Sequence, residues 1–188
     1  MKKSILIVLL VAFLAIAVGV SGCLNSGDDN STDNNTTNNS TPAPSFNGSI
    51  VTIDPVPAGY ELLAVKNVTA DSENIDGIND ALIGFVGYYA KGSSNVYLSV
   101  FQTESNKSAE GYVQSMIDAH KEKYPQSNNV TTVTINGHDA TLITETTTAG
   151  GSTVERYTLA WANGSNLVVL NGPATYGEIK TIAEASKL

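Results

Sequence analysis

The sequence predicts an α+β domain in which an antiparallel sheet, ending in a four-strand meander, is covered by helices. The first observation is a set of three glycine-containing dipeptides, Asn136-Gly137, Gly150-Gly151 and Asn163-Gly164, of the kind that forms two-residue hairpin turns. The second is that apolar and polar residues alternate between these dipeptides, as they do in half-buried strands. The third is that two segments, 108–124 and 175–186, carry apolar residues at helical spacing.

The first half of the domain is predicted to form strands on both sides of one long loop. Strands are expected at residues 49–53, 60–68, 81–90 and 95–103. Residues 70–80 are predicted to form a polar loop. The turn between the last two strands is expected at Lys91-Gly92-Ser93-Ser94, so that these two strands form a hairpin.

Two helices are predicted from their apolar stripes and their ends. The stripe of the first consists of Ala109, Tyr112, Val113, Met116, Ile117 and His120. Pro125 ends this helix. Thr175 and Glu178 form a capping box for the second helix, which runs to about Ser186 and turns Ile179, Ile182 and Ala183 toward the core.

The meander fixes the pairing of its strands if each turn is tight. Its strands are expected at about 130–135, 138–148, 153–161 and 166–171. Counting from the turns gives the pairs Val133–Ala140, Ala140–Trp161, Leu142–Leu159 and Leu159–Val168. These residues share one face, so Trp161 is predicted to be buried. On the other face Glu145 falls opposite Arg156, which predicts an exposed cross-strand ion pair.

Ahead of the domain, the N-terminus has the organisation of a secretion signal. Lys2 and Lys3 precede an apolar run, Ile5–Val20. The tract that follows, Ser21-Gly22-Cys23, resembles a prokaryotic lipobox. That resemblance implies a signal peptide over residues 1–22 and lipid attachment at Cys23, the only cysteine. Two acyl chains on this thiol would hold the protein at the membrane. The alternative is an uncleaved anchor helix; both place the remainder outside the cytoplasmic membrane.

Residues 23–47 are predicted to be a disordered, lipid-anchored tether rich in Asn, Thr and Ser. Such a composition cannot form a core that would offset the entropy of ordering the chain. Five asparagines in it begin Asn-x-Ser/Thr triplets and are candidate N-glycosylation sites: Asn30, Asn34, Asn35, Asn38 and Asn39. The globular domain is expected over residues 48–188.

Charge and cysteine content exclude several classes of function. The formal net charge is −8, and Arg156 is the only arginine. An acidic protein is repelled by phosphate backbones, so a nucleic-acid partner is not expected. A single cysteine allows no intrachain disulfide and no CxxC metal or redox motif.

Residues that could carry chemistry are few. His120 is expected to be partly buried near the end of its helix, and His138 to be exposed after a turn. A zinc site would require both histidines and a carboxylate to converge. The acidic tract with Asp71, Glu73, Asp76 and Asp80 lacks the spacing of a calcium loop and is interpreted as solvated. Strand aromatics, which are Tyr88, Tyr89, Tyr97, Phe101, Tyr157 and Trp161, are interpreted as packing residues rather than a ligand platform.

Several tracts together resemble PsbP/Mog1-like domains. They are PAGYELL, then GFVGYYAKGSSNVYLSVFQTE before a helix, then VTINGHDATLITET and ERYTLAWANGSNLVVLNG before a closing helix. The resemblance lies in the order of elements and turns over about residues 48–188. It implies an α/β/α sandwich and the role of an accessory or binding protein, found also among prokaryotic lipoproteins. It brings no catalytic residue and no cofactor.

The sequence therefore predicts a non-enzymatic accessory or binding module, lipid-anchored at the outer face of the cytoplasmic membrane. Its expected partners are the membrane, through the anchor, and a protein or glycan at the cell surface. Two alternatives stay open: a small extracytoplasmic hydrolase, and a purely structural component of the cell envelope. No catalytic residue, metal site or cofactor is predicted, because no nucleophile motif or phosphate loop is present.

Overall fold

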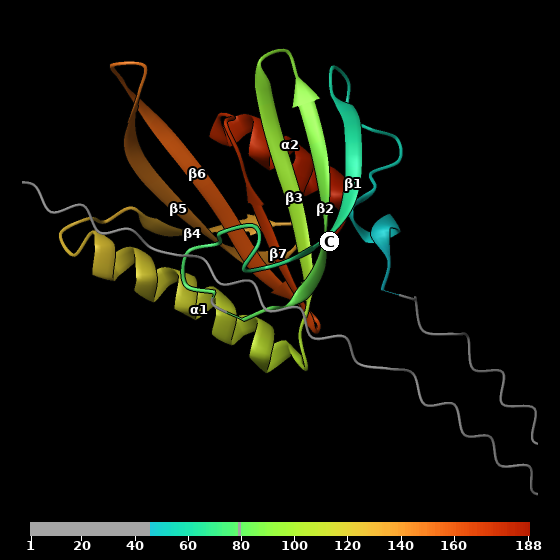
Figure 1. Cartoon of the computed structure of the whole chain (residues 1–188), viewed down its shortest axis with the longest axis horizontal. Coiled ribbons are helices and arrows are strands. Elements are labelled where there is room, and N and C mark those ends of the chain that lie inside the picture. Colours follow the sequence, from blue (N-terminus) through green and yellow to red (C-terminus); the bar gives the residue numbers. More distant parts are fainter. Residues whose placement is uncertain (1–45, 79) are drawn as a thin grey trace, which may run out of the picture. The chain divides into compact units, whose positions relative to one another are not determined.

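The computed structural model describes residues 46–78 and 80–188, which form one folded unit (Figure 1). Its elements are η1 (Gly48–Val51), β1 (Glu61–Thr69), β2 (Ile83–Lys91), β3 (Ser94–Gln102), α1 (Asn106–Lys123), β4 (Val130–Ile135), β5 (His138–Ala149), β6 (Ser152–Asn163), β7 (Asn166–Asn171) and α2 (Tyr176–Ser186). The seven strands form one antiparallel sheet in the order β1-β2-β3-β7-β6-β5-β4. The α+β class and the C-terminal meander are thus confirmed. None of the helices in the described part has the length and apolar character needed to cross a membrane.

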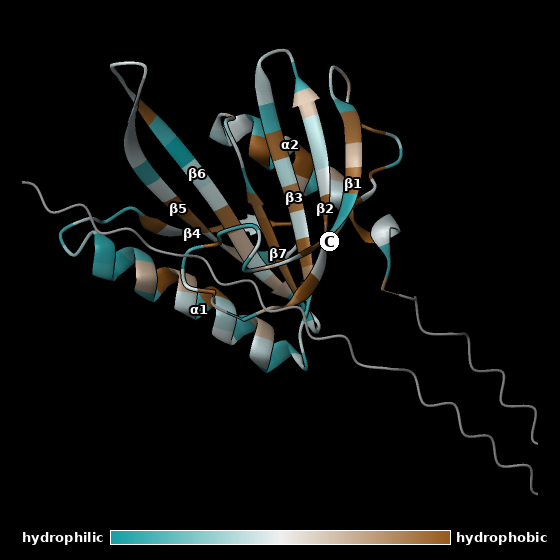
Figure 2. Cartoon of the chain, viewed as in Figure 1, coloured by the Kyte–Doolittle hydropathy of each residue, from teal (hydrophilic) through white to brown (hydrophobic). Residues whose placement is uncertain are grey.

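The sheet separates two hydrophobic clusters, one with each helix. Val168 and Leu170 of β7 pack in the cluster that contains Ile179 of α2. Leu167 and Val169 pack in the other cluster, which contains residues of α1. Since successive side chains of a strand point to opposite faces, α1 and α2 cover opposite faces of the sheet. Figure 2 shows that β7, the central strand, is hydrophobic along most of its length.

The hairpin turns confirm the predicted meander with one correction. Asn136 and Gly137 both have positive φ, as a type I′ turn requires. The third turn is centred on Gly164 and Ser165, because Asn163 pairs with Asn166. The predicted Leu159–Val168 pair is therefore wrong, and Leu159 lies opposite Leu170. The observed register differs from the predicted one by two residues, so every side chain still points to the predicted face of the sheet.

Trp161 is buried as predicted. Its side chain is 1% exposed and packs in the same cluster as Ala140, Leu159 and Val168. Trp161 lies directly opposite Val168 in the sheet. The buried indole Nε1–H has no hydrogen-bond partner among the described residues.

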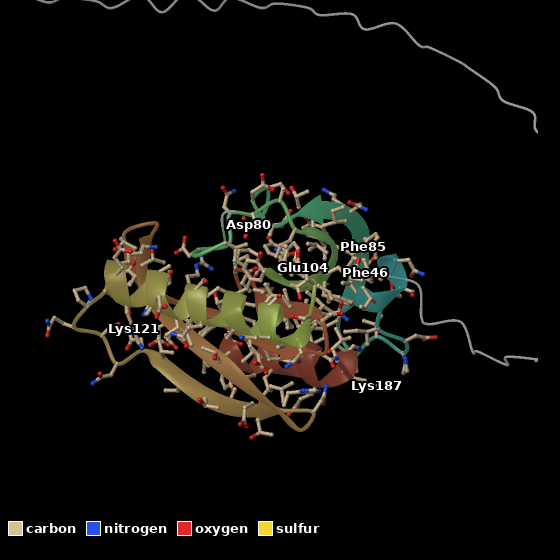
Figure 3. All side chains as sticks on the ribbon, turned by 90° about the horizontal axis from the view of Figure 1, so that it is seen from below. Phe46, Asp80, Phe85, Glu104, Lys121 and Lys187 are labelled. Atoms are coloured by element: carbon tan, nitrogen blue, oxygen red, sulfur yellow. The ribbon has the colours of Figure 1, made fainter. Side chains whose placement is uncertain are left out.

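The start of the domain differs from the prediction in two ways. The expected strand at 49–53 is instead the 3₁₀ helix η1, which Asn47 caps by accepting a hydrogen bond from the Ser49 amide at 2.9 Å. Phe46 lies beside Phe85, with ring centroids 5.4 Å apart (Figure 3). Phe46 and Asn47 were assigned to the tether but belong to the domain, because their side chains contact it.

A buried tyrosine holds this first segment against the sheet. The Tyr89 hydroxyl donates to the Val51 carbonyl at 2.6 Å and accepts from the Ile53 amide at 2.9 Å. Burial raises the pKa of this phenol above its ordinary value. The backbone groups of a strand at 49–53 would have formed hydrogen bonds with a neighbouring strand. In the structure the Tyr89 hydroxyl bonds two of these backbone groups instead.

The predicted capping box of α2 is confirmed. Thr175 Oγ1 accepts from the Glu178 amide, and the Glu178 carboxylate accepts from the Thr175 amide at 2.9 Å. That backbone hydrogen bond lowers the pKa of Glu178, because it stabilises the ionised form. The cap fixes where α2 begins after β7 and so sets how it lies across the sheet.

Candidate functional site

The loop between β1 and β2 folds back onto α1 and forms one wall of a groove. It was predicted to be a polar loop, but its Ile75 and Ile78 are buried among the residues that pack with α1. Asp80, labelled on this loop in Figure 3, accepts a hydrogen bond from the Tyr112 hydroxyl of α1 at 2.7 Å. The two buried isoleucines therefore hold the loop against α1. Some of the acidic side chains that led to the interpretation of this loop as solvated form bonds to that helix.

Close packing of loop and helix depends on Gly77. Its φ is +85°, and a Cβ there would lie 2.5 Å from the Ser115 carbonyl oxygen. Asp76 next to it forms an ion pair with Lys123, at 3.2 Å between Oδ2 and Nζ. Asp71 and Glu73 make no such contact with α1. Within the described residues, no cluster of His, Cys, Asp and Glu side chains is arranged to hold a metal ion.

His120 lies at one end of the groove, on the last turns of α1. It was expected to be partly buried and is only 2% exposed. Its Nδ1 lies 3.4 Å from Glu145 Oε1, and its Nε2 lies 3.2 Å from Ser127 Oγ. The order hydroxyl, imidazole, carboxylate is that of a hydrolytic triad. Both distances are long, however. Two cavities border His120, one beside Met116 and Ile143 and a smaller one beside Tyr124 and Asn129, and Ser127 lines neither.

Glu145 bonds to α1 rather than across the sheet. The register does place it opposite Arg156, as predicted. The expected ion pair between them is wrong: Glu145 Oε1 lies 3.7 Å from Lys123 Nζ, in addition to its contact with His120. The hydrogen bond to Asp76, together with the charge of Glu145, raises the pKa of the Lys123 amine. The cause of the error is the covering helix, which supplies a closer cation than the neighbouring strand does.

Two adjoining cavities make up the groove. The first, about 200 Å³, lies between the loop, α1 and β5, with His120 and Glu145 in its wall. The second, about 500 Å³, lies farther along the same face and contains Arg156. Both are lined by Ile75, Thr158 and Asn171, so they form one continuous depression on the sheet.

Several neutral polar side chains line the second cavity. Tyr97 and Ser99 come from β3, Thr158 from β6 and Asn171 from the end of β7. Tyr97 also packs edge-on against Tyr88, with centroids 5.3 Å apart. Sequence reasoning missed this site. The available signal was Ser99, a small polar residue between the apolar residues Leu98 and Val100 of β3.

The other predicted residues do not join the groove. His138 was expected to be exposed; it is half-buried and lines a separate cavity with Trp161 and Glu110. The two histidines therefore do not converge. Tyr89, Phe101 and Trp161 are core residues, which confirms their interpretation as packing aromatics. Cys23 and the five tether asparagines lie outside the described residues, as do the signal and most of the tether.

Comparisons with known proteins give a family and a distant structural likeness. The profile of a family described as a domain of unknown function, DUF4367, matches residues 50–185. No curated protein matches the sequence. Among solved structures, a GTP-binding regulator from Thermotoga maritima is similar at 14% identity, with a TM-score of 0.40, over 73% of this chain and 82% of that protein. A likeness at this level does not bear on function.

Proposed function

This chain belongs to the DUF4367 family, a domain of unknown function, and we propose that it is a membrane-tethered, extracytoplasmic binding module. One observation carries the binding role: the continuous groove of two cavities on the α1 face of the sheet. The larger cavity has a volume within the range of about 300–1,000 Å³ that is usual for small-molecule sites. Its lining includes several neutral polar side chains, which suits recognition of a small polar ligand.

The tethered, extracytoplasmic location rests on the N-terminal sequence. The proposal is that residues 1–22 are removed, that Cys23 carries the lipid and that the following residues span from the membrane to the domain. A glycan or protein of the cell surface is the proposed source of the ligand, and nucleic acid is not a proposed partner. The finer PsbP/Mog1-like assignment is also a proposal; the placement of α1 and α2 on opposite faces of the sheet supports it.

Two alternatives are less well supported. A small hydrolase would draw on the Ser127–His120–Glu145 arrangement, but Ser127 contributes to neither cavity beside His120, so a substrate held there would not meet its hydroxyl. A purely structural envelope protein would not require an open groove. A ligand-binding module accounts for the groove without a nucleophile.

We expect Cys23→Ser to abolish lipid attachment, since the thiol is the group that would be acylated. The measurement is metabolic labelling with a fatty-acid probe, followed by fractionation of membranes. The wild type should be labelled and membrane-bound, and the variant should carry no label. Ser21→Ala, which keeps a small residue before the cysteine, is the matched control and should label normally. Equal labelling of the Cys23→Ser variant would reject the lipoprotein proposal.

For the groove, we expect small polar ligands to perturb one set of amide resonances. The full-length chain, labelled with ¹⁵N and solubilised in detergent, would be titrated with neutral sugars, amino acids and sugar acids. Binding should shift the Thr158 and Asn171 amides, which belong to both cavities. The amides of α2, on the opposite face, serve as internal controls. If no member of the panel shifts a groove resonance, the binding proposal is wrong.

A further inference from the structure

The single arginine of this acidic chain lies in the larger cavity and has no partner among the described residues. Arg156 is half-buried on β6 and lines that cavity. Glu145, the residue directly opposite, contacts Lys123 and His120 instead. Throughout residues 46–78 and 80–188, the Arg156 guanidinium has neither an ion pair nor a hydrogen bond. Its five N–H donors are therefore available to a ligand.

A second unsatisfied group lies in the same cavity. Ser99 is 4% exposed and lines it, yet its hydroxyl has no hydrogen-bond partner among the described residues. The Ser99 oxygen is not fully buried, so its hydroxyl is open to a ligand in the cavity. A cavity with a guanidinium and a hydroxyl that have no partner among the described residues has the donors of an anion site. The Asn171 amide adds a donor in the shared wall.

We propose that this cavity binds the carboxylate of a small hydroxylated acid, with Arg156 as its main partner and Ser99 as a second donor. The inference rests on the proposed binding function and names the ligand class for the same groove. A planar guanidinium matches a carboxylate through two parallel hydrogen bonds. The neutral hydroxyl and amide groups of Tyr97, Thr158 and Asn171 suit the hydroxyl groups of the remainder of the ligand.

The charge around the cavity selects a monoanion. Arg156 supplies one positive charge, and Glu73 in the same wall is acidic. A phosphate dianion would bring a second negative charge with no cation to meet it, in a chain whose formal net charge is −8. A carboxylate is neutralised by Arg156 alone. The cavity should therefore prefer a sugar acid to the corresponding sugar phosphate.

The sole arginine also provides a direct probe. A ¹⁵N-labelled chain has one arginine Nε–Hε cross-peak, which can only come from Arg156. We would titrate the full-length chain in detergent with glucuronate, glucose and glucose 6-phosphate, which share a ring and differ in the charged group. Glucuronate should shift the Arg156 cross-peak and the Ser99 amide with saturation. Glucose should leave the side-chain cross-peak unmoved, and glucose 6-phosphate should bind more weakly than glucuronate.

Variants separate the guanidinium from general charge. Arg156→Gln should raise the dissociation constant for glucuronate at least about tenfold, since a hydrogen-bonded charge pair is lost. Arg156→Lys keeps the charge but not the planar fork and should give an intermediate value. Lys180→Gln removes an equal charge from an exposed pair on α2 and should have no effect.

The outcomes separate this inference from the proposed function. If glucose and glucuronate shift the groove amides equally, or if Arg156→Gln leaves glucuronate binding unchanged, the carboxylate assignment is wrong while the groove remains a binding site. If glucose 6-phosphate binds more tightly than glucuronate, the preference for a monoanion is wrong. If none of the three sugars shifts either the Arg156 cross-peak or a groove amide, the inference is overturned, and the wider ligand panel decides whether the binding function stands.

Discussion

Trp161→Ala is expected to lower the free energy of unfolding by about 3–5 kcal/mol, as large-to-small changes in a packed core do. The indole is 1% exposed and is among the largest fully buried side chains of the described residues. It belongs to the cluster that contains residues of the sheet and of α2. Chemical denaturation measures the loss. Fluorescence of the wild type, which has one tryptophan, should be blue-shifted and poorly quenched by acrylamide.

Two further variants test the cause of this loss. Trp161→Phe should cost clearly less, because it keeps an aromatic ring and removes an indole N–H that has no partner among the described residues. Ile83→Ala removes an apolar side chain that is 58% exposed and should change stability by less than about 0.5 kcal/mol. A near-neutral Trp161→Ala variant, with emission like that of free tryptophan in water, would contradict the core assignment and the register of the meander.

Gly77→Ala is expected to destabilise the domain by about 2–4 kcal/mol, combining a positive-φ penalty with overpacking. The added Cβ would lie 2.5 Å from the Ser115 carbonyl oxygen and 2.9 Å from the Met116 Cα. These are backbone atoms of a helix, so they cannot rotate away as a side chain could. The loop must therefore lift from α1, which would also open the wall of the groove that Ile75 forms. Denaturation and the groove amide shifts measure the two effects.

The same substitution on the helix provides the matched control. Gly111 lies within α1 and is exposed, and apart from the adjacent backbone of its own helix nothing lies within 4 Å of the position where a Cβ would be added. Gly111→Ala should stabilise the domain by up to about 1 kcal/mol, because alanine favours the helix over glycine. Opposite signs for the two variants would show that contact between loop and helix, rather than loss of glycine itself, matters at position 77. A neutral Gly77→Ala variant would show that the loop does not pack as described.

Much of the fold could be predicted because its determinants are local. The Asn136-Gly137 turn needs positive φ twice, and few residues other than glycine and asparagine tolerate this. The Thr175–Glu178 box satisfies its own helix end. The error at the third turn is also local: the dipeptide Asn163-Gly164 predicts a turn centred on those two residues, whereas Gly164 occupies the first central position. Either choice leaves Trp161 in the core, because the two differ by an even number of residues.

The groove could not be predicted, because it depends on segments far apart in the chain. In the sequence, Ile75 is an apolar residue within a polar tract, and only the position of α1 shows that it is buried. Arg156 had an obvious partner in Glu145 when only the sheet was considered. The position of Lys123 and His120 over the sheet shows that Glu145 contacts these two residues instead of Arg156. A sequence pattern describes neighbours along a strand and does not show which side chains of a covering helix will contact that strand.

By itself, the sequence determined the α+β class, the meander, the capped helices and the face of the sheet that buries Trp161. Each follows from short-range geometry: the period of a strand, the period of a helix, or the φ values of a turn. Only packing in three dimensions makes the first segment η1, anchors the acidic loop through two isoleucines, and leaves Arg156 in a cavity with no partner among the described residues. Those outcomes depend on which surfaces meet when α1 and the loop pack on the sheet, and on the cost of leaving buried polar groups without partners.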